Sequence, residues 1–143
     1  MYINQFRKQT ERIVKPYIVN VHQRSIENLN FRTTLWTGSY AQMTVMCIPV
    51  CSDIGLEIHE DTDQIIRIEH GMAIVKMGAE EKCLDYQTRV CEGDTIFVPA
   101  GMWHNIINIG KVSLKISTVY APPYHREETV HRTKEDAEHA SNI

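Results

Sequence analysis

The sequence lacks any apolar run that approaches the ~20 residues a membrane-spanning helix needs, and its first stretch, "MYINQFRKQTERIVKPY", has no apolar core and no small-residue cleavage site of a secretory signal. We therefore expect a cytoplasmic protein with no membrane partner. It also lacks a basic excess, since the net charge is -3 with 23% charged residues. Because nucleic-acid binding depends on a positive surface, we expect no nucleic-acid partner.

Paired cysteines are missing as well. The four cysteines stand at positions 47, 51, 83 and 91, which form neither a CxxC pair nor the spacing of a zinc ribbon. We expect reduced thiols that fill gaps in a sheet as small apolar side chains.

A helical pattern of 10 to 15 residues is absent between the apolar stretches, which argues against alternating strands and helices. Instead, short apolar stretches bounded by Gly, Pro, Asn or Asp follow one another from Phe31 onward. They read "AQMTVMCIPV", "DQIIRIE", "MAIVKM", "DTIFVP", "HNIINI" and "VSLKISTVYA". The pattern predicts an all-β domain that closes into a barrel or sandwich.

The flanks of this β region differ in texture and suggest three parts. Residues 1–30 are mixed and polar, and we expect an N-terminal extension with a short amphipathic helix over Gln5 to Ile13 that ends before Pro16. We expect residues 31–123 to form the barrel. Residues 124–143 are charged and lack an apolar period, which predicts a solvated polar tail whose histidines 125, 131 and 139 lie on the surface.

Two stretches carry polar residues in places that invite chemistry. In "GLEIHEDTDQIIRIEHG", from position 55 to 71, Glu57 and His59 share a face if the segment is a strand, and Gln64 follows an acidic turn. In "GDTIFVPAGMWHNIIN", from position 93 to 108, a bend at Pro99 and Gly101 precedes His104 and could aim its ring inward. From these residues alone, a metal site and an ordinary polar environment both remain open.

The second stretch resembles the second sequence motif of the cupin superfamily. Its fixed positions are all matched, and they are Gly93, Pro99, Gly101, His104 and Asn108.

The first cupin motif has a counterpart too, with its spacing kept. It falls on Glu57, His59, Gln64 and Gly71, where Glu57 replaces a histidine and Gln64 replaces a glutamate. Overall the chain is similar to the short single-domain cupins described as mannose-6-phosphate isomerase-like. The resemblance implies a double-stranded β-helix, or jelly-roll barrel, in which Glu57, His59, Gln64 and His104 hold a divalent metal ion such as Fe, Zn, Mn or Ni.

The chemistry of this set is consistent with that implication. Two imidazoles and one carboxylate with open positions suit Fe(II), Zn, Mn or Ni, and Gln64 would be a weak fourth ligand. The alternative is a site without metal, in which Glu57 is protonated or paired with an arginine such as Arg67. The four side chains would then form a polar network in a ligand-binding barrel.

Two functions follow. The first is a metal-dependent enzyme, of dioxygenase type or isomerase and lyase type, that acts on a small organic molecule with Glu57 or Gln64 as the catalytic proton carrier. The second is a non-catalytic cupin that binds a small ligand or a metal ion. The sequence shows no clear cluster of Arg and Lys that could bind a phosphate, which argues against a sugar phosphate substrate. We also expect a homodimer, because the extension and exposed strand edges would be covered by a second copy.

Overall fold

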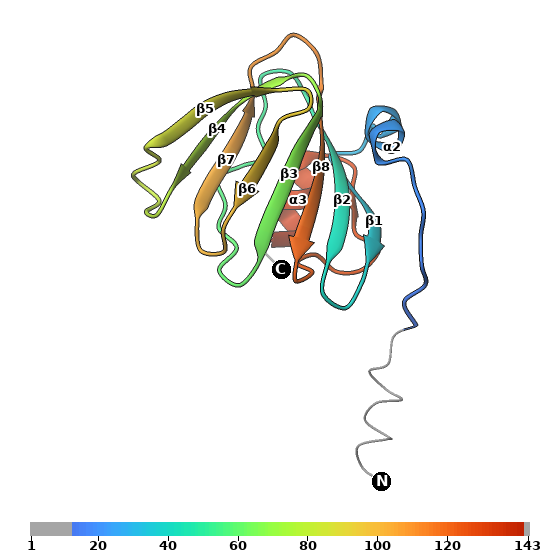
Figure 1. Ribbon diagram of the computed structural model, residues 1–143. Coiled ribbons are helices and arrows are strands. Elements are labelled where there is room, and N and C mark those ends of the chain that lie inside the picture. Colours follow the sequence, from blue (N-terminus) through green and yellow to red (C-terminus); the bar gives the residue numbers. More distant parts are fainter. Residues whose placement is uncertain (1–12, 142–143) are drawn as a thin grey trace.

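The computed structural model describes residues 13–141, and two antiparallel β-sheets form its core (Figure 1). The six-stranded sheet has the order β6 (Thr95–Val98), β3 (Asp63–His70), β8 (Leu114–Ala121), β2 (Gln42–Ile48), β1 (Arg32–Thr37) and β9 (Val130–His131). The three-stranded sheet has the order β5 (Tyr86–Cys91), β4 (Met72–Gly78) and β7 (Trp103–Asn108). The prediction of an all-β core is confirmed.

The core lies between the two sheets, as the alternation of side chains in β3 shows. Gln64, Ile66 and Ile68 are buried while Ile65 and Arg67 between them are exposed, because successive residues of a strand point to opposite faces. The inward side chains meet apolar residues from the other sheet and from β8. Fully buried residues among these include Ala73, Val75, Ile106, Leu114 and Ile116.

Glycines with positive φ let the chain change sheets within a few residues. Gly71 has a φ of 103° and joins β3 of one sheet to β4 of the other. Gly93 has a φ of 93° and leads from β5 to β6 in the same way. Residues with a Cβ rarely adopt these backbone angles, so glycine permits the sharp corners at which the chain passes from one sheet to the other.

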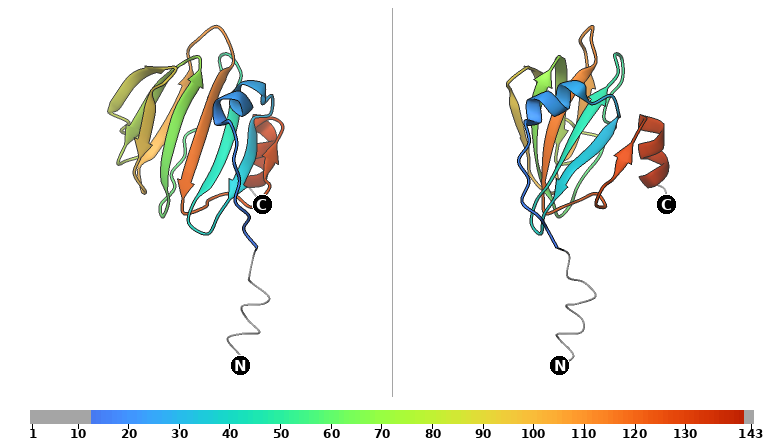
Figure 2. Two further views of the ribbon diagram at one scale, coloured as in Figure 1. Left: turned by 45° about the vertical axis from the view of Figure 1, so that its right-hand side comes forward. Right: turned by 90° about the vertical axis from the view of Figure 1, so that its right-hand side faces the viewer.

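A short helix, α2 (Val21–Glu27), packs across one end of the outer face of the six-stranded sheet (Figure 2). It begins at Asn20, whose side chain accepts a hydrogen bond from the backbone of Gln23. Its His22 lies 2.9 Å from the buried carboxylate of Glu69. The helix expected over Gln5 to Ile13 falls outside the described residues except at its last position.

The expected solvated tail requires a correction. Residues after Pro123 are polar, but β9 pairs with β1 in the six-stranded sheet, and a second helix, α3 (Lys134–Ser141), follows it. Ala137 of α3 is 8% exposed and joins the hydrophobic core, and Lys134 pairs with Asp53. This packing depends on one alanine, one ion pair and two backbone pairings. Such contacts leave no periodic pattern of apolar residues, so the sequence could not predict that the segment folds onto the barrel. Neither α2 nor α3, within residues 13–141, is long or apolar enough to span a membrane.

Candidate metal centre

Backbone pairing brings Glu57 directly opposite His104. The amide of Glu57 donates to the carbonyl of His104 at 3.0 Å, and the amide of His104 donates back at 3.0 Å. A second bridge between Asp53 and Ile107 continues the pairing, so residues 53–57 extend the three-stranded sheet beyond β7. Residues that exchange both hydrogen bonds in this way place their side chains side by side on one face.

The bend before β7 holds His59 beside this pair. The amide of Gly101 donates to the carbonyl of His59 at 2.9 Å, and Gly101 adopts a φ of 81°. The turn is closed by Met102, whose amide donates to the carbonyl of Pro99 at 3.2 Å. The same Pro-x-Gly segment that precedes His104 in sequence therefore also fixes the backbone that carries His59.

Three side chains converge closely enough to share one ion. Oε1 of Glu57 lies 3.5 Å from Nε2 of His59 and 3.6 Å from Nε2 of His104, and the potential ligand atoms of these three residues all lie within 4.8 Å of one another. Ligands bound at ~2.1 Å lie ~3.0 Å apart in an octahedral site and ~3.4 Å apart in a tetrahedral one. The spacing of the cluster is therefore close to that of a metal site.

The hydrogen bonds of the histidines fit the same role. Nδ1 of His104 lies 3.0 Å from the carbonyl oxygen of Met102, and because a carbonyl oxygen only accepts, Nδ1 carries the proton. In the neutral ring this leaves a lone pair on Nε2, which is buried and has no hydrogen-bond partner. A backbone carbonyl on the far nitrogen is one of the usual partners that orient a metal-binding histidine. Both ring nitrogens of His59 are likewise buried without a partner.

Glu57 is negatively charged at neutral pH. Burial raises the pKa of its carboxyl group, but the two imidazoles beside it, those of His104 and His59, outweigh burial and hold the pKa at about 2. The side chain remains 27% exposed, so the carboxylate faces open space as well as the two rings. One fixed negative charge among imidazoles suits a divalent cation.

Gln64 lies on the neighbouring sheet and also points inward. Its side chain is 2% exposed, and its Oε1 is buried without a hydrogen-bond partner. It stands opposite Tyr120 on β8, and the Tyr120 ring contacts the His59 ring at a centroid distance of 5.7 Å. The structure thus brings Glu57, His59 and His104 together and places Gln64 on the other sheet, where it also points into the interior.

The metal-free alternative that paired Glu57 with Arg67 is wrong. Arg67 points outward from β3 with a side chain 58% exposed, and its Nε lies 3.8 Å from Oε2 of Glu69. The physical reason is the strand period: Arg67 and Gln64 are an odd number of residues apart, so they face opposite sides of the sheet.

A cavity of about 1000 Å³ opens beside Glu57. Its wall includes four polar or aromatic residues that sequence reasoning did not assign to the site, namely Arg32, Tyr124, His125 and His131. Tyr124 directly contacts the cluster, since the centroid of its ring lies 4.0 Å from that of the His59 ring. Three of the four come from the segment expected to be a solvated tail. A signal was present nonetheless, because Tyr124 and His125 closely follow the last long strand and cannot lie far from its end.

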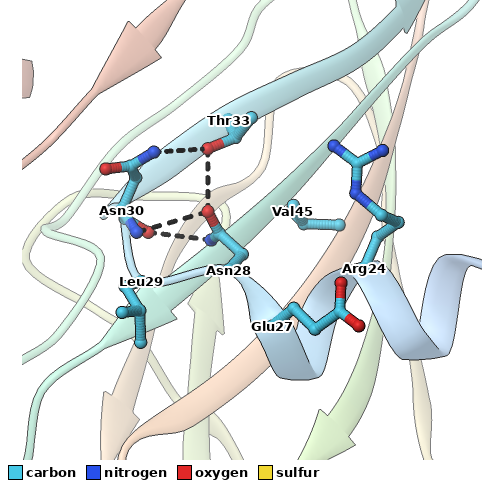
Figure 3. A pocket seen from close by; sticks show the side chains of 7 residues that line it. All are labelled: Arg24, Glu27, Asn28, Leu29, Asn30, Thr33 and Val45. Carbon is cyan, nitrogen blue, oxygen red and sulfur yellow. Dashed lines mark hydrogen bonds between the residues drawn. The ribbon is translucent and has the colours of Figure 1, made fainter.

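A second hollow of about 360 Å³ lies between α2 and the sheet (Figure 3). Three of its polar side chains hydrogen-bond to one another. Asn30 donates to Thr33 at 3.1 Å, and Thr33 donates to Asn28 at 2.8 Å. These contacts fix the end of α2 and the start of β1, so we assign this hollow a structural role.

The family model described as a cupin domain matches residues 44–120 of this chain, which is more than half of it. The chain belongs to the cupin family. The expected cupin barrel is therefore confirmed, and the two motifs of this cupin contribute Glu57, His59 and His104 to one cluster.

Similar proteins extend this result. This cupin is 50% identical to the uncharacterized protein YrkC of Bacillus subtilis (strain 168), over 86% of the chain and 66% of YrkC. It is 39% identical to the uncharacterized protein L612 of Acanthamoeba polyphaga mimivirus, over 76% of the chain and 67% of L612. The chain thus spans about two thirds of the length of these two relatives.

The protein BH2720 from Bacillus halodurans, whose crystal structure is known, is 44% identical in sequence to this chain. The two structures match with a TM-score of 0.87 over 87% of this chain and 95% of BH2720. The narrower resemblance to mannose-6-phosphate isomerase-like cupins has no support among these three proteins.

Proposed function

We propose that this cupin is a metal-dependent enzyme that acts on a small organic molecule, with Glu57, His59 and His104 as metal ligands and Gln64 as a weak fourth. The observation that carries the proposal is the pair of buried imidazole nitrogens, Nε2 of His59 and of His104, which have no hydrogen-bond partner and face one carboxylate. Buried polar atoms normally have hydrogen-bond partners. A cation bound between the two nitrogens and the carboxylate would explain why these nitrogens have none.

The cavity beside the cluster has the size of a small-molecule site. At about 1000 Å³ it lies at the upper end of the usual range of ~300–1000 Å³. A divalent ion there would supply a Lewis acid for a carbonyl or enolate oxygen, or O2 chemistry in the case of iron. Glu57, with a pKa of about 2, accepts rather than donates a proton at neutral pH. Gln64 has no titratable group, so beside its role as a weak metal ligand it can orient a group through its amide but cannot carry a proton.

Turnover is tested on the purified full chain loaded with Fe(II), Mn(II) or Zn(II). We expect metal-dependent change of a substrate in a panel of sugars and oxo acids, measured as O2 uptake or by proton NMR. His104→Ala should abolish it, and His139→Ala, which changes an exposed histidine of α3, should not. Ligand binding without turnover would instead support the non-catalytic alternative.

We further propose that the protein is a homodimer. Five apolar side chains form one continuous row across the outer face of the six-stranded sheet, and they are Phe97, Ile65, Val119, Met43 and Trp36 in strand order. Phe97 is 68% exposed and Ile65 is 38% exposed, although α2 covers the other end of this face. An apolar row of this length favours contact with a second copy.

A cytoplasmic location remains a proposal. Three of the four free cysteines, Cys51, Cys83 and Cys91, are exposed. Exposed thiols are typical of a reducing compartment.

A further inference from the structure

Arg32 is a buried cation in the wall of the cavity that contains Glu57. It stands at the start of β1, is 4% exposed, and lines the same cavity as Glu57. Arginine cannot lose its proton in a protein, so this position carries a permanent positive charge.

The neighbours that contact the Arg32 guanidinium among the described residues are uncharged. Nη1 lies 2.9 Å from Nδ1 of His131 and Nη2 lies 3.8 Å from the sulfur of Met46, while Nε is buried without a hydrogen-bond partner. Because a guanidinium only donates, Nδ1 of His131 is the acceptor and carries no proton. Burial and the Arg32 charge both lower the pKa of His131. His131 thus holds the guanidinium in place without neutralising it.

Within residues 13–141, no carboxylate lies within the 4.0 Å of an ion pair with Arg32. Another cation of the same cavity wall behaves differently, since Lys134 is paired with Asp53. A buried charge without a counterion is unfavourable unless something else supplies the opposite charge.

The charges around the cavity indicate what could supply it. Glu57 contributes one negative charge and Arg32 one positive charge, whereas Arg126 and Glu138 lie in the exposed part of the wall and offset each other. A divalent ion held by Glu57 would leave the interior with a net charge of about +2. An anion is therefore the favoured occupant of the space between the cluster and Arg32.

We propose that the small molecule bound at the metal centre carries a carboxylate, and that Arg32, positioned by His131, is the residue that binds it. The inference rests on the proposed function, because it takes the metal cluster as the other half of the site. The planar guanidinium matches the two oxygens of a carboxylate. Of the net charge of about +2, Arg32 carries one positive charge, which a single carboxylate balances, and the metal-bound side carries the other, which a second oxygen of the same molecule can meet.

The test is isothermal titration calorimetry on the Mn(II)-loaded full chain. The ligands are pyruvate, succinate and galacturonate, each against a neutral analogue, namely pyruvamide, succinamide and galactose, with inorganic phosphate as a further anion. We expect at least one carboxylate to bind and its neutral analogue not to bind. Arg32→Met should weaken that binding at least tenfold with unchanged metal content, and Arg32→Lys should weaken it less, because the charge is kept.

The proposal is overturned if no carboxylate binds, if phosphate binds instead, or if Arg32→Met binds as the wild type does. Should Arg32→Met not fold, Arg32→Lys and His131→Phe carry the test, and both are expected to weaken binding. The same titration without metal separates the two proposals. Carboxylate binding that depends on Arg32 in a protein that takes up no metal would refute the metal centre and leave the Arg32 assignment standing.

Discussion

At the scale of a single residue, His125 shows how burial and a nearby charge keep an ionisable side chain neutral. Its ring packs edge-on against Tyr120 at a centroid distance of 5.1 Å, and its Nε2 lies 3.3 Å from the Tyr120 hydroxyl. Burial first, and then the charge of Arg32, lower the pKa of His125 from 6.5 to about 3. Burial likewise raises the pKa of Tyr120 to about 12. Both groups are neutral at physiological pH.

This makes His125 a source of acid lability. Between pH 6.5 and 3 the unfolded chain binds a proton at this position that the folded chain does not, so the free energy of unfolding falls as the pH falls. The contribution is complete above pH 6.5. Between pH 7 and 5 the loss should be on the order of 1–2 kcal/mol.

We predict that His125→Phe, which keeps an aromatic ring and removes the titration, reduces this loss. The measurement is urea unfolding at pH 7, 6 and 5, with His139→Phe as the matched control at an exposed histidine. An unchanged pH dependence in His125→Phe would show that His125 is already protonated or exposed in the folded protein.

Among elements, α2 depends on one buried acid of the sheet. Glu69 is 2% exposed, and it accepts from the Ser117 hydroxyl at 2.6 Å and lies 2.9 Å from His22 of the helix. Removing a donor from a buried carboxylate leaves part of its charge unsolvated.

We therefore expect Ser117→Ala to lower the free energy of unfolding by roughly 1.5–3 kcal/mol, measured by urea denaturation. Ser113→Ala, in the loop before β8, is the control and should have little effect. Equal effects of the two substitutions would mean that the hydrogen bond from Ser117 to Glu69 does not stabilise the folded protein.

The elements also show which parts of the fold can be predicted from sequence. The six apolar stretches correspond to β2, β3, β4, β6, β7 and β8, because each is long enough for its apolar residues to mark a buried face. β5 could not be found, since five of its six residues are exposed and its pairing comes from backbone hydrogen bonds. β9 and α3 were missed for the same reason, as their contacts involve few apolar side chains.

The candidate site likewise has a part that the sequence could predict and a part that it could not. Glu57, His59 and His104 belong to two motifs with fixed spacing, so their convergence could be predicted. Arg32 and His131 lie 99 residues apart in sequence and meet only because β9 pairs with β1. Neither stands in a recognisable motif, and so the acidic-ligand part of the cavity becomes visible only in the structure.

At the scale of the whole molecule, the apolar row on the outer face predicts assembly. Light scattering coupled to size exclusion should give about twice the chain mass of 16.5 kDa. Phe97→Glu should convert the protein to a monomer, because it buries a charge in the contact. Tyr86→Glu, at a 60% exposed position of the other sheet, should leave the dimer intact. A wild-type mass of one chain at micromolar concentration would refute the homodimer.

The barrel as a whole serves to bring segments distant in sequence to one interior point, and the central claim is that a divalent ion is held there. Elemental analysis of the full chain, purified without chelators, tests it most directly. We predict close to one divalent ion per chain in the wild type and in His139→Ala, and little in Glu57→Ala and His104→Ala. Retention of the metal by both ligand variants, or a wild type that takes up no Fe, Mn, Ni or Zn, would contradict the account.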